Sequence, residues 1–200
     1  GLANNRLSAR SLSGKTPQEV SDILFGSSAQ SGQYNEGLTE DYYLGRESSE
    51  GFYRRVRGAL RLDMSFEQFD TAWGDIFTLN EEIARFIRRA DEAGYLQGVL
   101  SSTNPIHWKY MDRLARVEEL LGKSKVICTY HPDAGFKKPS SELFQTAVRR
   151  LGVPKGDVVY VDDVEGYTDA ALRFGFGASI HVDHAHQDYQ RRCIERLQEL

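Results

Sequence analysis

The sequence has few of the features that mark secreted, membrane or nucleic-acid-binding chains. Its 200 residues include only two cysteines, so we expect no disulfide framework and a reducing cytoplasm. Apolar runs such as VVYV at 158–161 are too short to cross a bilayer, and the polar start predicts no signal peptide. The net charge is −4 with both signs interspersed, which excludes a basic stripe for nucleic acid or anionic membrane.

The first part of the chain predicts helices only. A hydrophobic content of 40% can form a compact core, and the length suits one domain with a modest insertion. Thr16 starts a helix with Pro17 and Glu19 in a capping box, and Ser65 starts another with Gln68. Four amphipathic helices are expected, so we predict a small bundle domain over residues 1–79 and a second domain over 80–200.

From Asn80 onward, helices alternate with short strands. Asn80 caps a helix whose buried face is expected to carry Ile83, Phe86, Ile87 and Ala90. Strands are predicted at 95–100, 125–129, 157–161 and 178–182, with helices between them from near Pro105, Ser141 and Glu165. This α/β alternation predicts a doubly wound, Rossmann-like parallel sheet with its ligand crevice at the carboxyl ends of the strands. The helical bundle would act as a lid over that crevice.

Two adjacent acids end the third predicted strand. Asp162 and Asp163 follow VVYV and precede Gly166 and a helical pattern. Neighbouring carboxylates repel each other unless a cation neutralises them, so the pair indicates a site for Mg²⁺, whose purpose would be to hold a phosphate. The alternative is a solvated turn in which the acids favour a helix start.

Two other segments support a phosphate site. Ser101, Ser102, Thr103 and Asn104 follow the first predicted strand and precede Pro105, so hydroxyls and free N–H groups at a helix start form an anion cradle. The loop GFKKP at 135–139 places lysines before the next helix, and one of them can reach a phosphoryl oxygen.

With these motifs the chain resembles the haloacid dehalogenase-like hydrolase superfamily, and most closely its small sugar-phosphate phosphatases with a helical cap. The segments that carry the resemblance are LGRESSEGFYRRV, GVLSSTNPIHW, GFKKPSSELF and VVYVDDVEGYTDAA. It implies that Ser101 binds the phosphoryl group, that Lys138 stabilises that group and the nucleophile, and that Asp162 and Asp163 serve Mg²⁺. Ser102 stands where many relatives have Asn.

The first motif of that family is missing from the sequence. It supplies the nucleophilic Asp at the end of a first strand, but the residues before Glu19 include no acid and no apolar strand. Since that strand lies centrally in the family fold, its absence would leave two inner strand edges unpaired. We expect residues before Gly1 to supply it; another segment or chain, or a rearranged sheet, are the alternatives.

Two other functions stay open. A metal-independent haloacid dehalogenase would lack the paired acids, which favour the phosphatase. A module without the nucleophile would bind phosphorylated ligands or a partner without catalysis. The substrate is not identified by the sequence: His107 either packs beside its helix or contacts substrate, and Tyr34, Tyr42, Tyr43 and Arg46 are either substrate contacts or ordinary surface residues.

Overall fold

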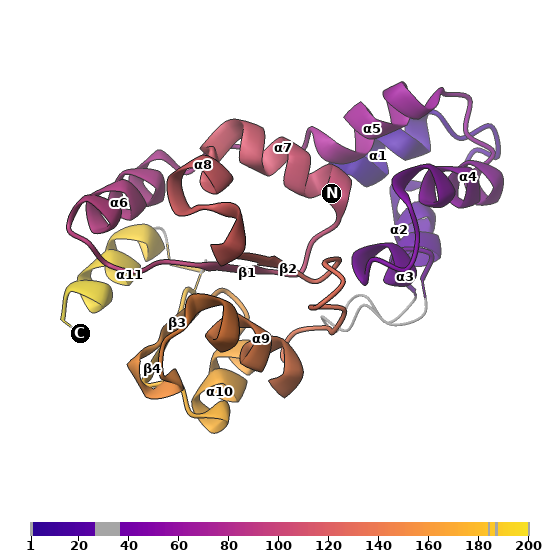
Figure 1. The fold of residues 1–200 in the computed structure, drawn as a ribbon. Helices are drawn as coiled ribbons and strands as arrows, with labels where there is room; N and C mark the ends of the chain where they lie inside the picture. The colour runs from indigo at the N-terminus through magenta and orange to yellow at the C-terminus, as the bar shows by residue number, and fades with distance from the viewer. Residues whose placement is uncertain (1, 27–36, 184, 187, 200) are drawn as a thin grey trace. The chain divides into compact units, whose positions relative to one another are not determined.

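The computed structural model describes residues 2–26, 37–183, 185–186 and 188–199, so Tyr34 lies outside the described residues (Figure 1). The chain packs as two compact units. The first comprises Gly1–Thr78, Ser102–Leu114 and Cys128–Gly135, and the second comprises Leu79–Ser101, Ala115–Ile127 and Phe136–Leu200. Two later segments therefore pack with the helical start of the chain, and the domain boundary at residue 79 stays a prediction.

Helices form the first unit. They are α1 (Leu2–Ala9), α2 (Pro17–Phe25), α3 (Glu40–Tyr43), α4 (Ser49–Leu60), α5 (Phe66–Gly74) and most of α7 (Pro105–Ala115). The described part of residues 1–79 thus holds five helices, and the prediction of four was wrong because α1 was not expected. This helix has no acidic residue in its first turn, so its start carries no local signal; burial of Ala3 and Leu7 holds it in place.

Side-chain caps fix the helix starts that the sequence predicted. The Thr16 side chain accepts from the backbone N–H of Glu19, and the Glu19 carboxylate accepts from the N–H of Thr16. Ser65 and Gln68 make the same reciprocal pair at the start of α5. Both capping boxes are confirmed, because each depends only on residues three positions apart.

Aromatic rings fill the core of the first unit. The Phe52 ring lies 4.4 Å from that of Tyr42 and 5.3 Å from that of Trp73. Tyr42 is fully buried, and its hydroxyl oxygen accepts from the N–H of Ile106 at 3.2 Å and shares a hydrogen bond with Ser49 Oγ. Burial raises the pKa of Tyr42 to about 12. Tyr42 is therefore a core residue, and its reading as a surface or substrate-contacting side chain was wrong.

The second unit contains the strands. They are β1 (Val99–Ser101), β2 (Val126–Cys128, whose last residue packs with the first unit), β3 (Val159–Asp162) and β4 (Ala178–His181). Its helices are α6 (Glu81–Glu92), α8 (Val117–Leu121), α9 (Ser141–Leu151), α10 (Glu165–Phe174) and α11 (Tyr189–Gln198), with short 3₁₀ turns η2 (Lys123–Lys125) and η3 (Lys155–Asp157). Strands β3 and β4 are parallel, with Asp162 opposite His181. The predicted α/β fold with parallel strands is confirmed.

The strands do not form one continuous sheet. Among the described residues, β1 pairs only with β2, and β3 pairs only with β4. Leu100 of β1 and Tyr160 of β3 nevertheless pack on the same cluster around Phe144. On the opposite face of β3, Val159 is 39% exposed and Val161 is 38% exposed. Because the two pairs of strands are separate, β1 and β3 each keep one edge without a strand partner among the described residues. The alternative of a rearranged sheet that pairs these edges is therefore not seen in the described residues.

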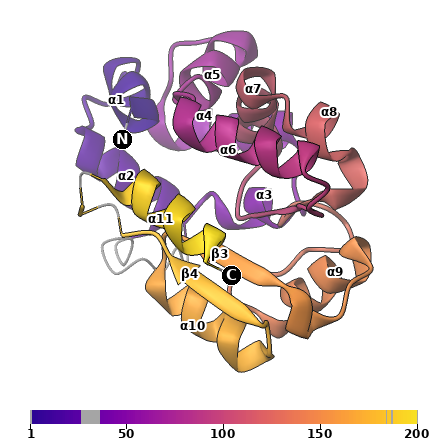
Figure 2. The ribbon, with the colours of Figure 1, turned by 90° about the vertical axis from the view of Figure 1, so that its left-hand side faces the viewer.

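Two further predictions about the second unit need correction. Residues 95–98 are not strand, because β1 begins only at Val99. Helix α6 is capped by Asn80 as predicted, but none of its residues is buried, so its apolar face is only half covered. Helices α6 and α11 pack against each other (Figure 2).

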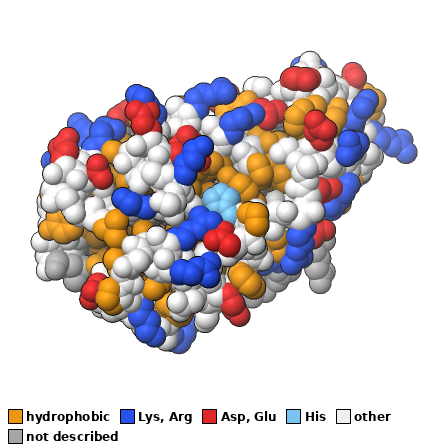
Figure 3. Space-filling model, viewed as in Figure 1, with side chains coloured by type: hydrophobic (Ala, Val, Ile, Leu, Met, Phe, Trp, Pro, Cys, Tyr) orange, Lys and Arg blue, Asp and Glu red, His pale blue; other side chains and the backbone are white. Residues whose placement is uncertain are grey.

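The surface agrees with the mixed charge of the sequence. Basic and acidic side chains are interspersed on the face in Figure 3. None of the helices in the described parts of the chain has the length and hydrophobicity that a bilayer span requires.

Candidate active site

The candidate site is built where β3 ends and where the loop before α9 passes. Side chains two apart on a strand share a face, so Tyr160 and Asp162 both turn toward the buried side of β3. Lys138 lies two residues before Ser140, whose side chain caps α9 by accepting from the N–H of Leu143. The cap fixes where the helix starts and therefore where the lysine stands.

The structure brings Lys138 and Asp162 into direct contact. Lys138 Nζ donates to Asp162 Oδ2 at 2.6 Å, and the two side chains are only 11% and 5% exposed. Tyr160 donates its hydroxyl to the same oxygen at 2.6 Å, and the N–H of Val164 donates to Oδ1 at 3.0 Å. Lys138 Nζ also lies 5.2 Å from the centre of the Tyr167 ring. A buried carboxylate is thus held by three donors, one of them charged.

These contacts determine the protonation states of Asp162 and Tyr160. Burial by itself would raise the pKa of Asp162, but the Lys138 charge and the hydrogen bonds from Lys138, Tyr160 and Val164 outweigh it, so the pKa is lowered. Burial and the neighbouring carboxylate raise the pKa of Tyr160. Asp162 is therefore ionised and Tyr160 protonated near neutral pH.

Asp163 differs from Asp162 in its surroundings. It is exposed at the end of β3, and its carbonyl oxygen lies 3.2 Å from Nε2 of His181. Two adjacent carboxylates are the hard oxygen donors that Mg²⁺ takes, since this ion is commonly held by one or two carboxylates together with water and phosphate. Among the described residues no three acidic, His or Cys side chains cluster as a metal site, so the pair fits Mg²⁺ only as part of a larger ligand set.

The other predicted site residues are distributed over both units. Ser101 ends β1 in the second unit and is half-buried, and the described residues show no hydrogen bond from it to Lys138 or Asp162. Ser102 is exposed and belongs to the first unit. Asn104 is fully buried, and its Oδ1 accepts from the N–H of His107 at 3.0 Å. Residues 101–104, the predicted anion cradle, therefore lead into α7 as predicted, while their anion-binding role stays a prediction.

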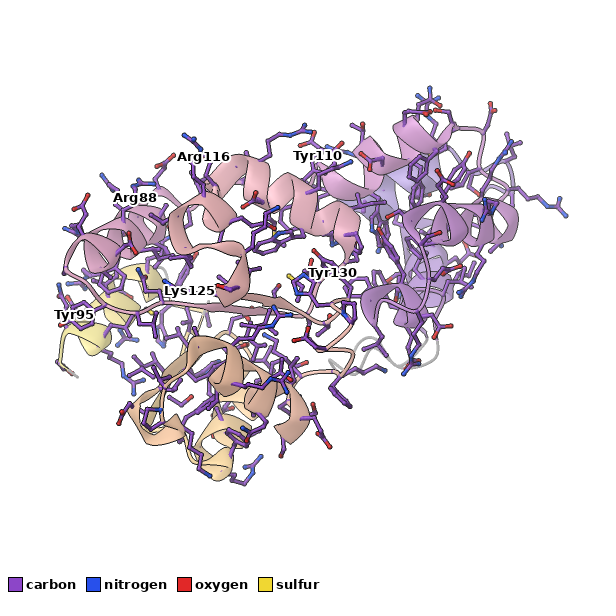
Figure 4. All side chains as sticks on the ribbon, viewed as in Figure 1. Arg88, Tyr95, Tyr110, Arg116, Lys125 and Tyr130 are labelled. Atoms are coloured by element: carbon purple, nitrogen blue, oxygen red, sulfur yellow. The ribbon has the colours of Figure 1, made fainter. Side chains whose placement is uncertain are left out.

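His107 lies in the aromatic core of the first unit. Its ring stacks on that of Trp73 at 5.2 Å, and its Nε2 lies 3.1 Å from the carbonyl oxygen of Trp73. Three residues along the same helix, Tyr110 donates to Asp70 Oδ2 at 3.0 Å (Figure 4). Burial lowers the pKa of His107 to about 4, so the imidazole is neutral at pH 7.

This burial predicts a pH-dependent stability for the first unit. Because the folded pKa of about 4 lies below the ordinary value of 6.5, the unfolded state binds the extra proton between these pH values. The free energy of unfolding should fall by up to about 3 kcal/mol as the pH falls through this window. Urea unfolding at pH 7 and pH 4.5, followed by tryptophan fluorescence, measures it. His107→Gln should show a flatter dependence, and an equal dependence in both proteins would contradict the assignment.

Tyr160 was missed by the sequence analysis. Its position two residues before Asp162 places both side chains on one face of β3. A tyrosine at that spacing from a site carboxylate was the available signal.

Comparison with known proteins now assigns the chain. Residues 30–175, well over half of the 200, match the model of the haloacid dehalogenase-like hydrolase family. The chain belongs to this family. The superfamily predicted from the four sequence segments is confirmed.

Solved structures of this hydrolase family share the fold. A family enzyme from Bacteroides thetaiotaomicron, crystallised with magnesium and inorganic phosphate, is 20% identical, with a TM-score of 0.69 over 85% of this chain and 86% of that one. Another structure of that enzyme has a TM-score of 0.75 at 18% identity, over 93% and 87% of the two chains. A predicted family hydrolase from Porphyromonas gingivalis is 19% identical, with a TM-score of 0.70 over 92% and 89%.

Asp162 is the last residue of β3 in this hydrolase-family chain, and Asp163 follows it directly. The described strands end at Ser101, Cys128, Asp162 and His181. Asp162 is the one acid in that set, and its carboxylate is already bound by Lys138, Tyr160 and Val164. A carboxylate paired in this way is a poor nucleophile.

Proposed function

We propose that the chain carries most of the active site of a Mg²⁺-dependent phosphatase that hydrolyses a small phosphorylated metabolite, such as a sugar phosphate, in the cytoplasm. The observation that carries the proposal is the buried contact between Lys138 and Asp162 beside the exposed Asp163 at the end of β3. A relative crystallised with magnesium and inorganic phosphate supports the choice of ligands.

Each site residue has a distinct task in this proposal. Lys138 presents a positive charge to a phosphoryl oxygen, and Asp162 holds the ammonium group in place. Ser101 donates a hydrogen bond to the same phosphoryl group, with Ser102 and His107 as further substrate contacts. Asp163, assisted by Asp162, would hold Mg²⁺, which when bound neutralises charge on the phosphoryl oxygens.

The attacking group is proposed to be an Asp that residues 1–200 do not contain. It would end a strand lying between β1 and β3, each of which keeps one unpaired edge among the described residues although both pack on one hydrophobic cluster. The carboxylate would attack phosphorus in line, the bond from phosphorus to the ester oxygen would break, and the alcohol would leave after its oxygen gains a proton. Water would then hydrolyse the aspartyl-phosphate to inorganic phosphate and the free carboxylate. The helical bundle would close over the bound substrate as a cap.

A second candidate is a non-catalytic module that binds phosphorylated ligands. It is favoured by one observation, namely that the acid at the end of the described strands is engaged by three donors. A haloacid dehalogenase is disfavoured because such an enzyme does not need paired acids for a metal.

A substrate panel separates these functions. The protein extended by its upstream coding sequence should release phosphate from small phosphate monoesters in Mg²⁺, and a chelator should abolish this activity. It should leave 2-haloacids unchanged. Halide release without metal would support the dehalogenase, and phosphate binding without turnover would support the binding module.

A further inference from the structure

Tyr160 links the hydrophobic core of the second unit to the candidate site. Tyr160 is 8% exposed, and the centre of its ring lies 5.4 Å from that of Phe144 and 5.9 Å from that of Phe176. Apolar neighbours of this kind would accommodate phenylalanine equally well. A buried hydroxyl costs free energy unless it is hydrogen-bonded, so the presence of tyrosine needs an explanation in what the hydroxyl binds.

The hydroxyl binds the oxygen that also holds the lysine. Asp162 Oδ2 accepts from Tyr160 and from Lys138 Nζ, each at 2.6 Å, while Oδ1 accepts from the N–H of Val164. Val164 alone would leave the carboxylate free to turn about the bond that carries it. With the second oxygen anchored to a ring fixed by Phe144 and Phe176, the carboxylate has one orientation.

Fixing Oδ2 also fixes the ammonium group. Lys138 has a long side chain with several rotatable bonds, and its ion pair in the structure is with Asp162. The direction in which its remaining N–H groups point therefore depends on where Oδ2 stands. Electrostatic catalysis depends on donors that are already in place, since reorientation costs free energy during the reaction.

We propose that Tyr160 is a positioning residue that sets the Lys138 ammonium group for phosphate through Asp162. This role rests on the proposed phosphatase function. Tyr160 itself does not contact the phosphoryl group; it acts through the carboxylate that the lysine also binds. The alternative is that the hydroxyl only stabilises the core.

Removing the hydroxyl alone tests the role. In the protein extended by its upstream coding sequence, Tyr160→Phe keeps the ring in its aromatic cluster, so the melting temperature should change little. Binding of inorganic phosphate in the presence of Mg²⁺, measured by calorimetry, should weaken about tenfold. In a Lys138→Met background the same change should have less than about a twofold effect, because a residue that acts through the lysine has nothing left to position. An equal loss in both backgrounds would overturn the proposal.

A second measurement is independent of phosphate. The Lys138 ammonium group should give a slowly exchanging ¹⁵N signal in wild-type protein, and Tyr160→Phe should broaden or remove it. Phe174→Leu disturbs the same cluster through the contacts of Phe174 with Phe144 and Phe176 and keeps the hydroxyl, so it should retain the signal. An unchanged signal in Tyr160→Phe would overturn the proposal. Wild-type protein that binds no phosphate would instead overturn the phosphatase function, while the ammonium signal still decides whether Tyr160 holds Lys138.

Discussion

Polypeptide Gly1–Leu200 is expected to release no phosphate from small phosphate esters, whereas the same chain extended by a strand ending in Asp should turn over in Mg²⁺. Loss of a covalent nucleophile typically lowers kcat by about 10⁴-fold or more, which places the unextended protein near the background of the assay. The physical basis is that β1 and β3 each keep one unpaired edge among the described residues, and we propose that an added strand pairs with both edges.

The extended protein also needs a control for folding. Changing the Asp at the end of the added strand to Asn should keep the melting temperature of the extended protein and return its activity to background. The extended protein could instead be more stable than Gly1–Leu200 and yet inactive with either Asp or Asn at the end of the added strand. That result would mean that the strand completes the sheet without supplying the nucleophile.

Asp163→Asn is expected to lower the affinity of the extended protein for Mg²⁺ by about 100-fold or more. Changes in residues that only support metal ligands commonly cost about 10- to 100-fold, and a hard cation loses more when a charged oxygen ligand is replaced by an amide. Turnover should fall with the affinity. Isothermal titration with Mg²⁺ measures the first effect and phosphate release the second.

Asp157→Asn is the matched control for this change. Asp157 is an exposed acid in η3, at the opposite end of β3, so its replacement removes the same charge without touching the strand end. Its Mg²⁺ affinity should stay within about twofold of wild type. Equal losses of Mg²⁺ affinity in both variants would mean that net charge, and not a ligand at the end of β3, causes the effect. Unchanged affinity in Asp163→Asn would mean that Asp162 and Asp163 form a turn that favours the helix start and do not bind the metal.

Local signals predicted the helix starts well. Thr16, Ser65 and Asn80 each cap a helix through a bond to a residue three positions later, so the sequence contains both partners side by side. Helix α1 has no such signal and depends on the burial of its side chains in the first unit. Its position could not be predicted because its partners are distant in sequence.

Strand pairing depends on contacts that a single sequence does not display. The β3 residues were predicted almost to their bounds. The division of the four strands into two separate pairs was not predicted, because it depends on which strand edges form hydrogen bonds with one another. Residues 95–98 have the composition of a strand and remain outside β1. The family resemblance nevertheless predicted unpaired inner edges, and β1 and β3 each keep one unpaired edge among the described residues.

The candidate site shows the same division between residue identity and geometry. Lys138 and Asp162 were predicted together from their positions before α9 and at the end of β3, and the structure joins them at 2.6 Å. In the structure Asp162 accepts hydrogen bonds from three donors, whereas Asp163 is exposed. The sequence could not predict this difference, because the two residues are adjacent and of the same type. The different tasks proposed for the two acids come from that contrast.

The most direct test of the account is to find which carboxylate becomes phosphorylated. The extended protein is mixed with a phosphate monoester, any acyl phosphate is reduced with borohydride, and the modified residue is located by mass spectrometry. We expect modification of the Asp that ends the added strand, with Asp162 and Asp163 unmodified. Modification of any carboxylate within residues 1–200, or Mg²⁺-dependent turnover by Gly1–Leu200 alone, would contradict it.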